Sequence, residues 1–208
     1  MQDDFRLPRI YPITDQNMSG LSHSQQVAVL AEAGATFIQL RDKTSSPREF
    51  FQEAARAITT ARRLGVQIII NDRVDIALAL SADGVHLGQS DMPPEAARRL
   101  LGSKALIGLS THSLQQALAG NQQPVDYIAF GPIFPTSSKS DGDPVVGLEG
   151  LAKARAVVHK PLVAIGGITE RNADAVFLAG ADSIALISAL LADTKAIKSQ
   201  VETFLTLI

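Results

Sequence analysis

The chain contains no cysteine and no tryptophan among its 208 residues, and aromatic residues make up only 5% of it. The lack of cysteine excludes disulfide bonds and thiolate metal sites. The scarcity of aromatic rings argues against a surface on which the bases of single-stranded nucleic acid would stack. No apolar run approaches the roughly 20 residues that a membrane-spanning helix needs. We therefore expect no nucleic-acid partner and no membrane association.

The remaining composition is ordinary for a globular protein. Hydrophobic residues make up 46% of the chain, charged residues make up 19%, and the formal net charge is −2. This balance indicates neither a nucleic-acid nor a membrane surface. The start of the chain is polar and acidic, so we see no signal peptide and expect a cytoplasmic protein. The length favours one catalytic domain over residues 1–208 rather than two domains.

Short apolar runs alternate with longer amphipathic segments along the whole chain. The runs are rich in β-branched residues and nearly continuous, as expected for strands buried on both faces. They cover residues 9–13, 36–40, 67–70, 84–87, 105–109, 127–130, 161–165 and 183–187. The predicted helices cover residues 22–33, a segment that begins at Ser46-Pro47, 73–80, 93–101, 114–119, 148–158, 171–178 and 194–205.

This strict alternation predicts a parallel sheet with crossover helices. An open doubly wound sheet and a closed barrel both agree with the pattern. The open sheet should carry a glycine-rich loop after its first strand, but Thr14-Asp15-Gln16-Asn17 stands there. We therefore predict an α/β fold, a compact (β/α)8 TIM barrel, with a very short helix between its third and fourth strands.

Active sites of such barrels lie at the carboxyl ends of the strands, where this chain carries many polar residues. Arg41, Lys43 and Lys139 are the cations predicted for that rim, with serines and glycines beside them. Such groups bind phosphate. Asp72 and Asp91 follow adjacent strands and could share one Mg²⁺, which takes one or two carboxylates together with phosphate oxygens. The alternative is that each caps the helix that follows it.

A second anion site is indicated near the last two strands. Gly166-Gly167 follows the seventh strand and Ser188 follows the eighth, where barrels often bind a phosphate. His86 and His112 could be a core histidine and a loop residue, respectively. No strong nucleophile stands at the centre. The residues by themselves thus suggest an enzyme that joins or splits two phosphorylated fragments by stabilising a leaving group.

The motifs also resemble a known family, thiamine phosphate synthase (thiamine-phosphate pyrophosphorylase). The strings that carry the resemblance run in order from the first strand to the last and span nearly the whole chain. They are YPITD (11–15), QLRDK (39–43), INDRVD (70–75), GVHLGQ (84–89) with Asp91, GLSTH (108–112), GPIFPT (131–136) through Lys139, AIGGI (164–168) and ISA (187–189).

The resemblance implies a transferase that couples 4-amino-2-methyl-5-hydroxymethylpyrimidine diphosphate with 4-methyl-5-(2-phosphoethyl)thiazole, giving thiamine phosphate and diphosphate. It implies one Mg²⁺ per subunit, held by Asp72 and Asp91. The residues implied as diphosphate contacts are Arg41, Lys43, Asn71, Ser110 and Lys139, of which all but Asn71 are expected to be catalytic. Those implied around the pyrimidine are Tyr11, Gln39 and His86, and those around the thiazole phosphate are Thr136, Ser138, Gly167, Ile187 and Ser188.

Two alternatives stay open. A related group of thiazole tautomerases shares the barrel and the phosphate site and uses a histidine near the end of the fifth strand, where His112 stands. A non-catalytic protein that binds thiazole phosphate is the other alternative. The tautomerase has no use for a diphosphate site, so the cations together with Asp72 and Asp91 favour the synthase. The expected partners are small molecules, and a homo-oligomer is compatible with the sequence, which does not fix the oligomeric state.

Overall fold

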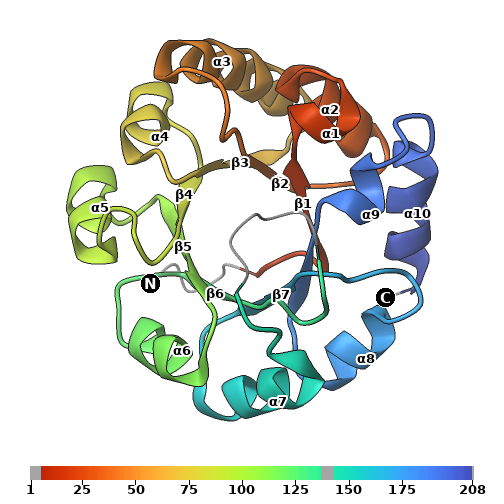
Figure 1. Cartoon of the computed structure of the whole chain (residues 1–208). Helices are drawn as coiled ribbons and strands as arrows, with labels where there is room; N and C mark the ends of the chain where they lie inside the picture. The colour runs from red at the N-terminus through yellow and green to blue at the C-terminus, as the bar shows by residue number, and fades with distance from the viewer. Residues whose placement is uncertain (1–5, 137–142, 208) are drawn as a thin grey trace.

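Eight parallel strands form a closed barrel in the computed structural model, which describes residues 6–136 and 143–207. The strands follow one another around the barrel in chain order, and the last pairs with the first (Figure 1). They are β1 (Ile10–Thr14), β2 (Phe37–Leu40), β3 (Gln67–Asn71), β4 (Gly84–Leu87), β5 (Leu106–Thr111), β6 (Tyr127–Phe130), β7 (Leu162–Ile165) and β8 (Ser183–Leu186). The predicted barrel is confirmed, and the open sheet is wrong.

The helices form a ring outside the strands (Figure 1). Those that the structure describes are α1 (Gln16–Ser19), α2 (His23–Glu32), α3 (Pro47–Leu64), α4 (Val74–Leu80), α5 (Pro94–Leu101), α6 (Leu114–Asn121), α7 (Gly147–Val157), α8 (Ala173–Leu178), α9 (Ser188–Leu191) and α10 (Ile197–Leu207). All eight predicted helices are present, and α4 is as short as expected, with 7 residues. The short helices α1 and α9 were not predicted.

The strands read as continuous apolar runs because both of their faces are covered. One face packs against the helices, and the other fills the barrel interior. Nearly every strand residue is buried, including all of β1, β2, β4, β6 and β8. The start of α3, which the sequence analysis places at Ser46-Pro47, has a capping box: Ser46 Oγ accepts from the Glu49 amide, and the Glu49 carboxylate accepts from the Ser46 amide.

Candidate active site

Asp72 occupies an unusual backbone position directly after β3. Its φ is 61°, in the left-handed region that Asp and Asn tolerate better than most residues. The Asp72 amide donates to the His86 carbonyl over 2.8 Å, which holds the turn against β4. Strain of this kind persists where the surrounding structure fixes it, and it gathers at functional sites. The turn thus sets the direction of one carboxylate at the rim of the barrel.

The alternative of two helix caps is wrong. The residue that caps α4 is Arg73 and the one that caps α5 is Pro93, and neither helix start has a side-chain cap. The Asp91 carboxylate instead accepts from the Gly88 amide over 2.7 Å, within the loop that follows β4. Both aspartates are therefore available for another role.

The two carboxyl groups lie together and are accompanied by a cation. Lys43 Nζ lies 2.5 Å from Asp72 Oδ2. Burial raises the pKa of Asp72; Lys43 opposes this effect, and the adjacent Asp91 carboxyl adds to it. Two neighbouring carboxylates of which one is partly buried favour a bound cation.

A magnesium ion suits this pair by its coordination chemistry. Among residues 6–136 and 143–207, no cluster of three or more His, Cys, Asp or Glu residues is placed to hold a metal. Mg²⁺ does not need such a cluster, because it binds through one or two carboxylates and completes its shell with water and phosphate oxygens. Asp72 and Asp91 therefore fit a cation that arrives with an anionic substrate.

Other polar groups face the same rim from neighbouring strands. Asn71 ends β3 and is buried, and its amide nitrogen finds no hydrogen-bond partner within the described part of the chain. A buried donor without a partner is costly, so it indicates a ligand that accepts from it. Arg41 follows β2, and its guanidinium lies 3.3 Å from the Asp15 carboxylate. Ser110 lies near the end of β5 and is partly exposed.

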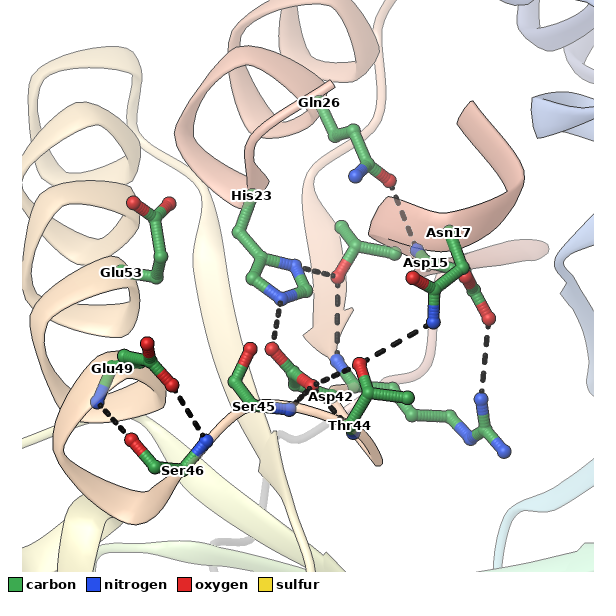
Figure 2. A network of polar contacts seen from close by, with 12 residues as sticks. Asp15, Asn17, His23, Gln26, Asp42, Thr44, Ser45, Ser46, Glu49 and Glu53 are labelled. Atoms are coloured by element: carbon green, nitrogen blue, oxygen red, sulfur yellow. Dashed lines mark hydrogen bonds and ion pairs between the residues drawn. The ribbon is translucent and has the colours of Figure 1, made fainter. Parts of the chain in front are cut away.

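The loop that carries Arg41 and Lys43 rests on a polar network (Figure 2). Asp42 lies between the two cations and accepts from the amides of Thr44 and Ser45, each over 2.9 Å. His23 Nε2, from α2, lies 3.6 Å from Asp42 Oδ2. Burial by itself raises the pKa of Asp42, but these hydrogen bonds and His23 outweigh it and hold the pKa at about 2.

The same histidine also supports the other side of the loop. His23 Nδ1 lies 2.7 Å from Thr14 Oγ1, which accepts from the Arg41 amide over 3.3 Å. His23 is fully buried. Burial lowers the pKa of His23, and the nearby Asp42 opposes the shift. These contacts hold the backbone around Asp42 against the barrel wall. Arg41 and Lys43, which flank Asp42 in the chain, remain at the rim.

The residues expected around the pyrimidine lie inside the barrel, directly beneath that rim. Gln39 Nε2 donates to the Tyr11 hydroxyl over 2.9 Å, and His86 Nε2 lies 2.9 Å from Ser110 Oγ. Tyr127, which the sequence analysis did not single out, joins these two pairs through its hydroxyl. Burial raises the pKa of Tyr11 and Tyr127 well above the ordinary value of a phenol, so both stay protonated.

A cavity of about 270 Å³ opens beside this region, between the ends of β5, β6, β7 and β8. Among its lining residues are all the described members of the predicted thiazole phosphate set, Thr136, Gly167, Ile187 and Ser188. Gly167 has a φ of 64°, and a Cβ there would come within 2.6 Å of the Pro135 carbonyl oxygen, so the position requires glycine. Ser138 and Lys139 lie outside the described residues.

His112 also lines this cavity. Its Nδ1 lies 2.8 Å from the Gly131 carbonyl oxygen and 3.4 Å from the Asp143 carboxylate. Because a carbonyl only accepts, Nδ1 carries a proton in this arrangement. His112 is therefore more than a solvated loop residue, since it forms part of the cavity wall.

Known proteins resemble the chain over most of its length. The family model described as thiamine monophosphate synthase matches residues 10–190. A thiamine-phosphate synthase of Chloroflexus aurantiacus is 48% identical over 185 residues, covering 88% of this chain and 85% of that protein. One from Koribacter versatilis is 42% identical over 200 residues, covering 94% of both.

A solved structure is similar as well. A thiamine phosphate pyrophosphorylase from Pyrococcus furiosus superposes with a TM-score of 0.87 at 37% identity, covering 96% of this chain and 94% of that one. None of the helices in the described residues has the length and apolar character to cross a membrane. From the family match and these relatives, the chain belongs to the thiamine monophosphate synthase family and is a transferase.

Proposed function

We propose that this enzyme couples 4-amino-2-methyl-5-hydroxymethylpyrimidine diphosphate with 4-methyl-5-(2-phosphoethyl)thiazole, releasing diphosphate. One observation supports the proposal: a cluster of carboxylates with a lysine and a separate cavity both lie at the carboxyl ends of the barrel strands. The first combines Asp72 and Asp91 with Lys43, and the second is the 270 Å³ cavity that Gly167 and Ser188 line. A reaction between two phosphorylated substrates needs two such sites, whereas a reaction of one phosphorylated substrate needs only one.

At the first site, Asp72 and Asp91 would hold one Mg²⁺ on the diphosphate. The amide nitrogen of Asn71 has no hydrogen-bond partner among residues 6–136 and 143–207, and it would donate to a diphosphate oxygen. The cations and hydroxyl proposed for the remaining oxygens are Arg41, Lys43, Ser110 and Lys139. Tyr11, Gln39 and His86 would surround the aminopyrimidine, because they lie beneath that rim inside the barrel. Thr136, Ser138, Gly167, Ile187 and Ser188 would hold the thiazole phosphate.

The proposed chemistry is a dissociative transfer. The C–O bond to the diphosphate breaks, its electron pair leaves with the diphosphate, and the thiazole nitrogen donates its lone pair to the resulting pyrimidine cation. Bound Mg²⁺ would supply positive charge to the leaving diphosphate. Arg41, Lys43 and Asn71 act where negative charge develops, which is where binding lowers the barrier. Such a reaction needs no protein nucleophile, and none of the groups described above is placed as one.

The direct test mixes the purified protein with both substrates and Mg²⁺ and measures thiamine phosphate and diphosphate. We expect both products in equal amounts. Isomerisation of the thiazole carboxylate phosphate without coupling would instead assign the protein to the tautomerases, in which His112 would be the acid–base group. Binding of thiazole phosphate with neither reaction would assign it a non-catalytic role.

The metal pair is tested by Asp91→Asn, which keeps an oxygen for the Gly88 amide and removes the charge. We expect Mg²⁺-dependent turnover to fall by about 100-fold or more, since a preorganised charge is lost from the leaving-group site. Binding of thiazole phosphate should be unchanged. Asp75→Asn is the matched control, because Asp75 pairs with Arg73 in solvent. Parental turnover in Asp91→Asn would contradict the shared-metal proposal.

A further inference from the structure

A chain of hydrogen bonds crosses the barrel interior beneath the candidate site. It links five side chains from five strands: Gln39 (β2), Tyr11 (β1), Tyr127 (β6), His86 (β4) and Ser110 (β5). The two phenol oxygens lie 2.9 Å apart. Tyr127 OH lies 3.1 Å from His86 Nδ1, and His86 Nε2 lies 2.9 Å from Ser110 Oγ. Every member except Ser110 is buried.

The link between Tyr127 and His86 passes directly over β5. His86 is in register with Gly108, and Gly108 is in register with Tyr127, so the three residues occupy one level of the barrel. A Cβ at Gly108 would lie 2.4 Å from His86 Nδ1 and 2.4 Å from Tyr127 OH. Only glycine leaves room for this hydrogen bond. Glycine at this position of β5 therefore allows a hydrogen bond between side chains of β4 and β6, two strands that are not neighbours.

One direction of donation along this chain starts at Gln39, whose contacting atom can only donate. The Gln39 amide nitrogen can only donate, so it provides a proton to the Tyr11 oxygen. Tyr11 then has its own proton for the Tyr127 oxygen, and Tyr127 has its proton for His86 Nδ1. A neutral imidazole that accepts at Nδ1 carries its proton at Nε2, which donates to Ser110 Oγ.

We propose that Tyr127 is a positioning residue that fixes His86 as the Nε2–H tautomer and thereby leaves the Ser110 hydroxyl proton for an anionic oxygen of the substrate. The proposal rests on the proposed function in one respect, since it takes the Ser110 partner to be the diphosphate. With the chain reversed, Ser110 would donate to His86 and present only lone pairs to the anion. The tautomer of a buried histidine thus decides whether Ser110 attracts or repels the leaving group.

The tautomer is measured without substrate, from the side-chain ¹⁵N chemical shifts of the 4 histidines. The signal of His86 is identified by its loss in His86→Gln. We expect the Nε2–H pattern in the parent protein and a shift toward Nδ1–H in Tyr127→Phe, which keeps the ring. An Nδ1–H pattern in the parent, or an unchanged tautomer in Tyr127→Phe, overturns the proposal. The parent spectrum gives this answer even if the variant folds poorly.

A double-mutant cycle tests whether Tyr127 acts through Ser110. We expect Tyr127→Phe to weaken binding of the pyrimidine diphosphate on the order of tenfold, the effect of one hydrogen bond to an anion, and to leave thiazole phosphate binding unchanged. In a Ser110→Ala background, Tyr127→Phe should have little further effect. Full additivity would contradict the proposed route. If the parent fails to couple the two substrates, the proposed function fails, but the tautomer assignment remains testable by its own spectrum.

Discussion

Asn71 is a residue at which folding stability and the proposed function favour different side chains. It is buried, and its amide nitrogen has no hydrogen-bond partner within the described residues. Leaving such a donor unsatisfied costs about 1–3 kcal/mol. A sequence selected only for folding would place an apolar residue of similar volume there. The amide is instead retained next to Asp72, at the point where the proposed diphosphate would accept from it.

We therefore predict that Asn71→Leu separates the two properties. The melting temperature should stay the same or rise, because an unsatisfied buried donor is replaced by an apolar side chain of similar size. Turnover should fall by about tenfold or more, because one hydrogen bond to the leaving group is lost. Thermal denaturation and steady-state kinetics on the same preparation provide the measurement. A variant that is both less stable and fully active would show that Asn71 is structural.

The loop between β2 and α3 holds two proposed diphosphate-binding residues at its surface and turns the side chain of the residue between them inward. Arg41 and Lys43 follow the carboxyl end of β2. The Asp42 carboxylate between them turns to the amides of Thr44 and Ser45 and to His23 (Figure 2). The pattern QLRDK predicts the cations as rim residues. It does not show that Asp42 is their anchor, because the partner, His23, lies on a different helix.

The Asp42 carboxylate makes a contribution to folding stability that depends on pH. The pKa of Asp42 is about 2, below its ordinary value of 3.8, so ionisation of the carboxyl stabilises the folded state. The contribution is complete above about pH 4 and is lost as the pH falls through about 2. We expect Asp42→Asn to lower the free energy of unfolding at pH 7, with a deficit that shrinks as the pH falls toward 2. Urea denaturation at several pH values measures this, and a deficit independent of pH would argue against the charge.

The same kind of hydrogen bond recurs at the opposite end of the barrel, where the strands begin. Asp83, Asp126 and Asp182 directly precede β4, β6 and β8, and each carboxylate accepts over 2.7 Å from an amide at the start of the preceding strand. The acceptor satisfies a donor that the parallel ladder leaves open at its end. The pairs β3–β4, β5–β6 and β7–β8 therefore begin with the same amide–carboxylate hydrogen bond.

Asp126 is the member of this set for which we predict the clearest loss of stability. Its carboxylate accepts from the Ile107 amide and lies 2.6 Å from Arg98, and both charged side chains are largely buried. Asp126→Ala should reduce the free energy of unfolding by about 1–3 kcal/mol, since two donors lose their acceptor. Asp75→Ala, which removes an exposed ion pair, should change it by less than about 1 kcal/mol. Equal losses in both variants would rule out this explanation.

For the whole molecule, the closed barrel follows from features that the sequence displays: eight apolar runs, eight amphipathic segments and no glycine-rich loop after the first strand. The candidate site at the rim follows too, because the strand ends are where polar residues stand. Other features depend on the register in which neighbouring strands pair. Tyr127 lies in an apolar run and looks like core; only its alignment with Gly108 and His86 reveals its hydrogen bonds. The helices α1 and α9 have 4 residues each, too short to show a periodic pattern.

The closed barrel also predicts how the two proposed anion sites respond to loss of metal. The carboxylate pair follows β3 and β4, whereas the cavity lies between the ends of β5 and β8, so the proposed metal ligands and the cavity come from different strands. Without a cation, Asp72 and Asp91 repel a diphosphate, and Lys43 is engaged by Asp72. Chelation of Mg²⁺ should therefore abolish binding of the pyrimidine diphosphate in titration calorimetry and leave binding of the thiazole phosphate within about twofold. Added Mg²⁺ should restore the first without altering the second. If chelation weakened both equally, the two sites would be one coupled unit, and the division of the barrel into a metal-dependent and a metal-independent half would be wrong.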